Sequence, residues 1–295
     1  MKEFFDAENR RVEFLDERFY ISDCGEKYYP SVTRVLDSLP KGAQFYMWMK
    51  DVGHNASLIA ERAANEGTNV HDALESILKG DEVNWMDDSG KARYNKTEWQ
   101  CILKGFEFIE QYNPKPIHVE ARVVSDKYQI GGTADLICKM GRQNWLIDWK
   151  TSKSLSESHM VQLSIYAHMI EEKLGIKIHN AGVLWLKANT RGMDKAGMPK
   201  EPKRLKKDTD SDFNAKMKQY KKDYGTWKRA KMKRKIQGKG WQFVPVHYKK
   251  QGLDLTGKKA IKKYMAVWNA VKYIYDFYNE GDKPKNLIYP TTLKI

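Results

Sequence analysis

Short apolar runs, separated by turn residues, recur along the chain from residue 117 onward. Runs rich in branched and aromatic residues are typical of strands in a partly or fully buried sheet. Five segments have this character: 117–125, 129–139, 144–150, 181–188 and 241–248. Gly141 supplies a turn between the second and the third. We therefore predict five strands, the second and third of which are joined by a short turn.

Segments with helical periodicity lie before, between and after these strands. A short helical stretch precedes Gly42, and residues 44–66 predict a longer helix. Gly67 is a start signal and Gly80 a stop signal for a separate helix. Three further helices are predicted at 97–112, 156–175 and 257–281. Strands interleaved with helices predict an α/β fold with one mixed central sheet flanked by helices.

The composition is that of a folded protein of a reducing compartment. A hydrophobic fraction of 41% and an aromatic fraction of 12% are sufficient for a core. No apolar run is long enough for a membrane helix, and the charged N-terminal residues lack the apolar stretch of a signal peptide. Cys24, Cys101 and Cys138 are too scattered for a disulfide framework, a zinc ribbon or an iron–sulfur cluster. We expect a cytoplasmic protein without membrane contact.

The net charge of +14 is unevenly distributed along the chain. Residues 1–186 carry 23 basic and 28 acidic side chains, whereas residues 187–263 carry 25 basic and 7 acidic side chains. The second block therefore has a net charge of +18. Such a density of positive charge predicts a polyanionic partner, and nucleic acid is the commonest one. The alternative is a solvated, lysine-rich insertion that only aids solubility.

Charged residues also lie within the predicted strands, where an unpaired charge is strongly destabilising. Asp148 and Lys150 project from the same face of their strand, because side chains alternate along a strand. Asp135 lies on the neighbouring strand, and Glu120 lies on the strand before it. Carboxylates this close repel one another, and a divalent cation such as Mg²⁺ removes the repulsion. The alternative is an Asp–Lys ion pair at a strand end, with Asp135 capping a turn.

These residues resemble the signature of the PD-(D/E)XK nucleases of the RecB type. The pattern D-(x)12-D-x-K runs from Asp135 to Lys150, and Q-x-x-x-Y follows at Gln162 and Tyr166. The resemblance implies a restriction-endonuclease-like core. It also implies hydrolysis of phosphodiester bonds by a water molecule that a metal ion activates.

The resemblance extends upstream of the strands. PSVTRVL (30–36) and GTNVHDALESIL (67–78) are similar to the N-terminal half of the mitochondrial genome-maintenance exonuclease and of related phage exonucleases. In those proteins the histidine of G-x-x-x-H is a metal ligand, and it matches His71. A histidine on an apolar helix stripe would otherwise be interpreted as a core residue. The remaining histidines are interpreted as structural or exposed: His54, His118, His159, His168, His179 and His247.

The resemblance implies one or two Mg²⁺ or Mn²⁺ ions in the site. Their ligands would be the side chains of His71, Asp135 and Asp148 and the backbone carbonyl of Trp149. Lys150 would be the catalytic lysine, and Glu120 would contact a metal-bound water, a second ion or Lys150. Gln162 and Tyr166, one helical turn apart, would line the site or touch DNA.

Aromatic residues interleave with the lysines and arginines of the basic segment 189–240. Lysines neutralise phosphates and aromatic rings stack on unpaired bases, so we predict a single-strand-binding flap beside the active site. The predicted DNA-binding residues are Lys153, Tyr220, Tyr224, Trp227, Lys228, Arg229, Lys231, Lys233, Arg234 and Lys235. The alternative is a flexible insertion whose aromatic residues pack locally.

One motif points to a different chemistry but does not complete it. GLDLTGKK (252–259) nearly matches the phosphate-loop pattern G-x-x-x-x-G-K-[ST]. Lys259 replaces the hydroxyl residue that would hold Mg²⁺, and no acidic apolar strand follows. We interpret the motif as a helix start and expect no nucleotide cofactor.

We expect a single nuclease domain that spans residues 1–295. Its expected parts are a mainly helical region (1–112), the catalytic strands and helix (113–188), the basic insertion (189–240), and a last strand, long helix and tail (241–295). The resemblance implies a role in DNA repair or recombination, with replication or recombination proteins as partners. It also implies the host cytoplasm as the location if a phage encodes the chain.

The expected activity is a metal-dependent DNA exonuclease that acts on single-stranded ends. One alternative is a structure-specific or nicking endonuclease of the same fold, and a second is a catalytically inactive nucleic-acid-binding module. The second alternative gives no reason to keep Asp135, Asp148 and Lys150 within strands. Nothing in the sequence reads a 2′-hydroxyl, so the choice between DNA and RNA stays open.

Overall fold

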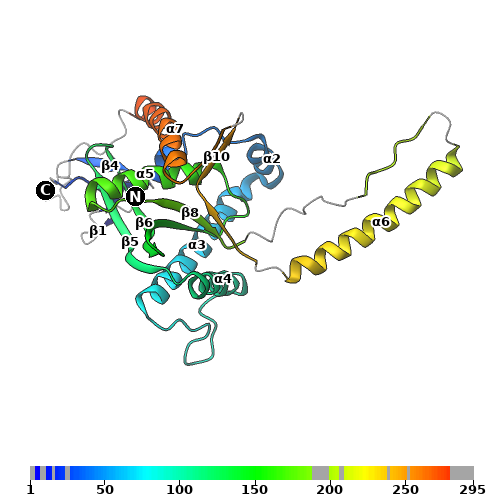
Figure 1. The fold of residues 1–295 in the computed structure, drawn as a ribbon, viewed down its shortest axis with the longest axis horizontal. Helices are drawn as coiled ribbons and strands as arrows, with labels where there is room; N and C mark the ends of the chain where they lie inside the picture. Colours follow the sequence, from blue (N-terminus) through cyan, green and yellow to red (C-terminus); the bar gives the residue numbers. More distant parts are fainter. Residues whose placement is uncertain are drawn as a thin grey trace, which may run out of the picture.

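A five-stranded mixed sheet forms the centre of the computed structural model (Figure 1). The structure describes residues 4–6, 11–14, 17–23, 27–187, 199–205, 209–237, 240–250 and 253–279. The sheet contains, in spatial order, β5 (Lys115–Ser125), β6 (Ile130–Met140), β7 (Gln143–Lys150), β8 (Asn180–Trp185) and β9 (Gln242–Pro245). Only β7 and β8 are parallel neighbours within it. The mixed central sheet predicted from the sequence is therefore confirmed.

Helices cover both faces of this sheet (Figure 1). One face carries α1 (Val32–Leu36), α5 (Glu157–Leu174) and α7 (Gly257–Tyr278), and the other carries α3 (Ala56–Lys79) and α4 (Lys96–Tyr112). Ile165 and Trp268 are buried in the first core, and Phe108 and Trp149 are buried in the second. The sheet thus lies between two apolar layers, and this packing fixes the position of its strands.

A small antiparallel sheet precedes the helices. It contains β1 (Phe4–Asp6), β2 (Arg11–Phe14), β3 (Glu17–Ile21) and β4 (Tyr28–Pro30). The sequence predicted a mainly helical region at 1–112 and did not predict this sheet. Its strands are three to five residues long, and so short a segment gives too few alternations for a period of two to be recognised.

Two adjacent glycines of β6 receive side chains from other elements, Gly131 from the small sheet and Gly132 from α5. A Cβ atom on Gly131 would overlap the side chain of Tyr20, which is buried on β3. A Cβ atom on Gly132 would overlap the hydroxyl of Tyr166 on α5. The two glycines therefore allow two tyrosine side chains to approach β6 at backbone distance.

The predicted helix boundary at Gly67 is wrong. The break lies at Gly53, which ends α2 (Ala43–Val52) with a φ of +54°. After one turn of 3-10 helix (Gly53–Asn55), α3 continues through Gly67 without interruption. There α3 passes the end of β7, and a Cβ on Gly67 would lie 3.4 Å from Thr151 Oγ1, which is an ordinary van der Waals contact. Gly67 therefore lies within a helix and does not start one.

The strand predicted at 241–248 is two strands in two sheets. β9 ends at Pro245, and β10 (His247–Lys250) pairs with β11 (Leu253–Thr256) in a separate hairpin. Proline lacks the N–H that would continue the ladder. Between the strands, Val246 N–H donates to Ala181 O at 2.8 Å. The interpretation of the phosphate-loop-like motif as a helix start is confirmed, because α7 begins directly after β11.

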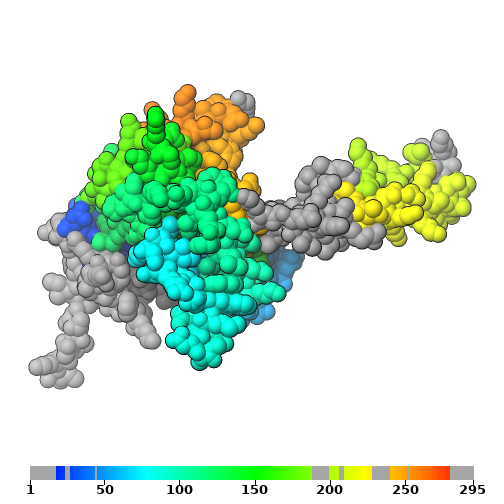
Figure 2. Space-filling model, turned by 60° about the horizontal axis from the view of Figure 1, so that its bottom comes forward, coloured from blue at the N-terminus to red at the C-terminus, as the bar shows by residue number. Residues whose placement is uncertain are grey.

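The basic insertion contains α6 (Asp210–Gln237), which extends away from the central sheet (Figures 1 and 2). The rings of Tyr220 and Tyr224 have centroids 5.8 Å apart, and those of Tyr224 and Trp227 are 5.6 Å apart. These aromatic residues therefore pack on one another along the helix. None of the described helices combines the length and apolar character that a membrane crossing requires.

Gly131→Ala should weaken the junction between the two sheets. The added methyl group must displace the buried Tyr20 ring, at a cost of about 1–3 kcal/mol in the free energy of unfolding. Thermal and urea unfolding measure the effect. Gly42→Ala is the matched control, because a Cβ there meets nothing within 4 Å. Equal stability of the two variants would contradict this packing.

Candidate active site

The predicted alternation along β7 is confirmed. Ile147 and Trp149 face the core beneath α3 and α4, whereas Asp148 and Lys150 project from the opposite face. Asp148 is 4% exposed, so its charge requires a partner close by. Lys150 Nζ lies 2.8 Å from both carboxylate oxygens and donates its hydrogen bond to Oδ1. The D-x-K segment thus forms a largely buried ion pair.

Asp135 and Glu120 face each other across β5 and β6. Their strands are paired on both sides of them, at Val119↔Leu136 and at Ala121↔Ala134. Glu120 has a φ of +49°, which is an unfavourable backbone conformation for a residue with a Cβ. Such strain persists only where the surrounding structure enforces it, and it is concentrated at functional sites. The local kink turns the Glu120 carboxylate towards that of Asp135.

His71 reaches this cluster from the middle of α3. Its Nε2 lies 3.1 Å from Trp149 O, and its Nδ1 lies 3.5 Å from Asp135 Oδ2. The backbone N–H of Trp149 donates to the same Asp135 oxygen at 2.8 Å. Ligand atoms of His71, Glu120 and Asp135 all lie within 4.8 Å of one another. The structure therefore brings together residues that are separated by up to 78 positions in the sequence.

This group of donors fits a divalent cation. Carboxylate and carbonyl oxygens suit Mg²⁺, and an imidazole nitrogen makes Mn²⁺ equally suitable. Adjacent ligands of an octahedral ion lie about 3 Å apart, given metal–ligand bonds of about 2.1 Å. The 3.1 Å between His71 Nε2 and Trp149 O is such a spacing. Asp148 Oδ2 is buried, and its contact with Lys150 Nζ at 2.8 Å is an ion pair rather than a well-directed hydrogen bond. A carboxylate oxygen has more than one lone pair, so this oxygen can face a cation as well.

The electrostatics of the site favour the same conclusion. Burial, followed by the nearby charges of Asp135, Glu75 and Asp72, raises the pKa of Glu120 to about 8. Burial also raises the pKa of Asp135, although the neighbouring His71 opposes this shift. Burial is the largest cause of both shifts, and the neighbouring carboxylates raise the pKa of Glu120 further. A bound cation would favour the ionised form of both carboxyl groups.

Lys150 remains positively charged at neutral pH. Burial lowers its pKa, but the charges of Asp148 and Asp135 outweigh burial and the net pKa is raised. Its side chain is 20% exposed and lies on the wall of an open pocket beside the strands. A fixed ammonium group in this position can stabilise negative charge that develops on a phosphate.

Gln162 and Tyr166 are both buried on α5, about one helical turn apart. Gln162 also lines the pocket beside Lys150. The structure places His159 there too, one turn before Gln162, although the sequence analysis interpreted it as structural or exposed. Burial and the Lys150 charge lower the pKa of His159 to about 4, so its imidazole is neutral. His159 precedes Gln162 by three positions, a spacing that places the two side chains on the same face of a helix and could have indicated a shared site.

The other predicted DNA-binding residues do not join this cluster. Lys153 is exposed in the loop after β7. Tyr220, Tyr224 and Trp227 lie on α6, which projects away from the sheet (Figure 1), and their role in binding single strands stays a prediction. The remaining predicted side chains lie outside the described part of the structure: Lys228, Arg229, Lys231, Lys233, Arg234 and Lys235.

Comparison with known protein families agrees with this geometry. The family model described as the PD-(D/E)XK nuclease superfamily matches residues 42–246. The match contains all five strands of the central sheet together with α3, α4 and α5. No curated protein matches the chain. The superfamily predicted from the sequence is thus confirmed, whereas the closer resemblance to RecB-type, mitochondrial and phage enzymes stays a prediction.

Without metal, the protein should lose stability as the pH rises from about 5 to 8. Glu120 holds its proton in the folded state up to its raised pKa of about 8, whereas the unfolded chain releases it near 4.5. The contribution is complete below 4.5 and is lost as the pH passes through 8. Melting temperatures in EDTA measure this loss, which Mg²⁺ should reduce.

Glu120→Gln should flatten this pH dependence, because the amide does not titrate. Glu110→Gln is the control, since Glu110 is exposed on α4. The assignment of the effect to Glu120 fails if both variants keep the slope of the wild type.

Proposed function

The chain belongs to the PD-(D/E)XK nuclease superfamily, and on that premise we propose that it is a metal-dependent exonuclease that hydrolyses DNA from single-stranded ends. The observation that carries this proposal is the convergence of His71, Glu120 and Asp135 beside the Asp148–Lys150 ion pair. Nucleases of this superfamily use divalent metals. The site is therefore proposed to be intact and active.

In the proposed reaction, His71, Asp135, Asp148 and the Trp149 carbonyl hold the cation. The cation, when bound, supplies a Lewis acid for the phosphate and lowers the pKa of the attacking water. Lys150 is proposed to act as a cation rather than as a base, because its raised pKa keeps it protonated. Its ammonium group stabilises the phosphate charge in the transition state, and Asp148 fixes its direction.

Glu120 supports the proposed reaction in a different way. Its carboxyl group lies with His71 and Asp135 in the same cluster of ligand atoms. It can accept a hydrogen bond from a water bound there, which would orient that water towards the phosphate. The strained backbone of Glu120 is consistent with such a positioning role.

The proposal of a nucleic-acid substrate rests on charge, and the choice of DNA rests on the resemblance to DNA exonucleases. Residues 187–263 have a net charge of +18, and α6 places part of this charge on a long helix with exposed lysines. Such a surface binds the phosphate backbone without regard to sequence. The preference for free ends rests on the resemblance to exonucleases alone.

Lys150→Ala should lower the rate of hydrolysis about 100- to 10,000-fold, because it removes the charge that stabilises the phosphate. The assay compares end-labelled linear and covalently circular single-stranded DNA in Mg²⁺, Mn²⁺ or EDTA. We expect metal-dependent loss of the linear strand alone. Lys139→Ala, at an exposed lysine of β6, is the control and should leave the rate unchanged.

Other outcomes of this assay have distinct meanings. Cleavage of circles would replace the exonuclease by an endonuclease of the same fold. DNA binding without cleavage in either metal would leave only a binding module.

Replacing both Lys221 and Lys222 by Gln should weaken DNA binding and its salt dependence. Both lysines are exposed on α6. Each phosphate contact that is lost should reduce the slope of log K against log salt by about 0.7 for single strands. Fluorescence anisotropy in EDTA at several salt concentrations measures this slope. The pair Lys91→Gln and Lys96→Gln, exposed near α4, is the control; identical slopes for the two double variants would exclude α6 from DNA binding.

A further inference from the structure

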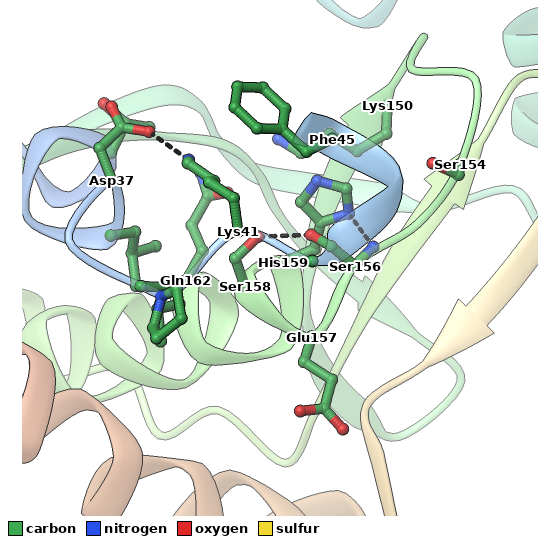
Figure 3. Close-up of a pocket in the computed structure, with 15 residues that line it drawn as sticks. Asp37, Lys41, Phe45, Lys150, Ser154, Ser156, Glu157, Ser158, His159 and Gln162 are labelled. Carbon is green, nitrogen blue, oxygen red and sulfur yellow. Dashed lines mark hydrogen bonds and ion pairs between the residues drawn. The ribbon is translucent and has the colours of Figure 1, made fainter. Parts of the chain in front are cut away.

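A pocket with a volume of about 670 Å³ lies beside Lys150 (Figure 3). Its walls come from two segments that are far apart in the sequence. The connection from α1 to α2 supplies residues 37–42, and the start of α2 supplies Phe45. The loop after β7 and the first turns of α5 supply the opposite wall, residues 154–162.

The pocket is continuous with the proposed reaction site. Lys150 and Gln162 lie on its wall, and Lys150 is at the same time paired with Asp148 at 2.8 Å. A phosphate held against the Lys150 ammonium group would therefore have one of its two neighbouring nucleotides at the mouth of this pocket. The pocket is therefore adjacent to the position proposed for the phosphate.

The size and lining of the pocket suit a single nucleotide. Its volume falls within the roughly 300–1,000 Å³ of sites that bind ligands of drug size, and a nucleotide belongs to this size class. Phe45 lines the pocket and is 39% exposed, although its ring also lies near those of Tyr46 and Trp48, with centroids 5.6 and 6.0 Å away. The exposed part of the ring offers an aromatic surface on which a base can stack. Figure 3 shows Phe45, His159 and Ser158 around the same space. The lining thus combines an aromatic surface with hydrogen-bonding groups.

The two carboxylates on the pocket wall do not exclude a phosphate group. Asp37 is paired with Lys41 at 2.9 Å, and Glu157 is paired with Lys250 at 2.8 Å. Both negative charges are therefore offset by lysines. Lys150 then adds a positive charge at the end nearest the reaction site.

His159 contributes a neutral hydrogen-bond donor. The backbone N–H of Ser156 points to His159 Nδ1 at 3.4 Å, which makes Nδ1 the acceptor of the ring. The proton of the neutral imidazole is then on Nε2. This N–H is suited to a phosphate or base oxygen.

We propose that this pocket binds the nucleotide next to the scissile phosphate, with its base stacked on Phe45. The proposal rests on the proposed function, because it takes a nucleic-acid strand as the substrate. A base that enters between α2 and α5 and stacks on Phe45 has left the duplex stack and its complementary base. The pocket is therefore a specificity determinant that selects unpaired strands.

The test uses 2-aminopurine, a base whose fluorescence is quenched by stacking, at each of the terminal positions of a single-stranded oligonucleotide. Binding to the wild-type chain in EDTA should quench one position. Phe45→Ala should restore the fluorescence at that position, and Phe45→Tyr should keep the quench. Met47→Ala is the matched control, because Met47 is 65% exposed on the same helix and does not line the pocket.

Cleavage provides the second readout. Phe45→Ala should lower kcat/KM on single-stranded DNA roughly tenfold. An abasic site at the quenched position should slow the wild type by a similar factor, yet slow Phe45→Ala by less than about twofold further, since the base and the ring act as one pair.

The proposal is overturned if Phe45→Ala and Met47→Ala behave alike in both assays. It is also overturned if the abasic site slows wild type and Phe45→Ala by the same factor. A quench that depends on Phe45, in a chain that cleaves nothing in Mg²⁺ or Mn²⁺, would support the pocket and reject the proposed hydrolysis. The two proposals can therefore fail separately.

Discussion

The repulsion among buried carboxylates is the constraint on which the rest of the structure depends. Asp135 and Asp148 are 9% and 4% exposed, and Glu120 faces Asp135 from the next strand. His71 and Lys150 approach these acids but leave negative charge in excess, as the raised pKa of Glu120 indicates. Such a cluster destabilises the fold on its own. A cation that binds only the folded chain would convert this cost into binding free energy.

The fold supplies this cluster by close packing between elements. α3 runs past the end of β7 without a break, and only this continuous helix brings His71 to the Trp149 carbonyl. On the other face, Gly132 allows the Tyr166 hydroxyl to lie against β6, next to the acidic strands. Packing contacts outside the set of proposed metal ligands thus determine where these ligands lie. Stability and the geometry of the site are served by the same contacts.

Local patterns in the sequence predicted what depends on local order. The strands from 117 to 150 were predicted from apolar runs between turn residues, and the common face of Asp148 and Lys150 from side-chain alternation. The structure confirms both. The continuity of α3 through Gly67 could not be predicted in this way. At Gly67 the helix lies beside Thr151, which is 84 positions away in the sequence. A contact of this kind leaves no periodic signal in the sequence.

The same limit applies to the site. The acidic residues, Lys150 and His71 were recognised from motifs. The proposed stacking of a base on Phe45 depends instead on the pocket between the start of α2 and the start of α5. Exposed aromatic residues are common on protein surfaces, so Phe45 carries no signal by itself. The pocket is formed because the connection from α1 to α2 lies opposite the first turns of α5. Only the tertiary structure shows this arrangement.

The distribution of charge separates binding from chemistry. Residues 1–186, which contain every proposed metal ligand, have a net charge of −5, and the basic segment has a net charge of +18. A phosphate backbone is therefore repelled by the acidic cluster and attracted by the insertion that carries α6. Binding of a cation reverses the local sign only at the cluster. The affinity of residues 1–186 for a nucleic-acid strand should thus depend on the metal. The affinity of the basic insertion for the same strand should depend on the salt concentration. This division explains how one chain can hold a polyanion next to a group of buried acids.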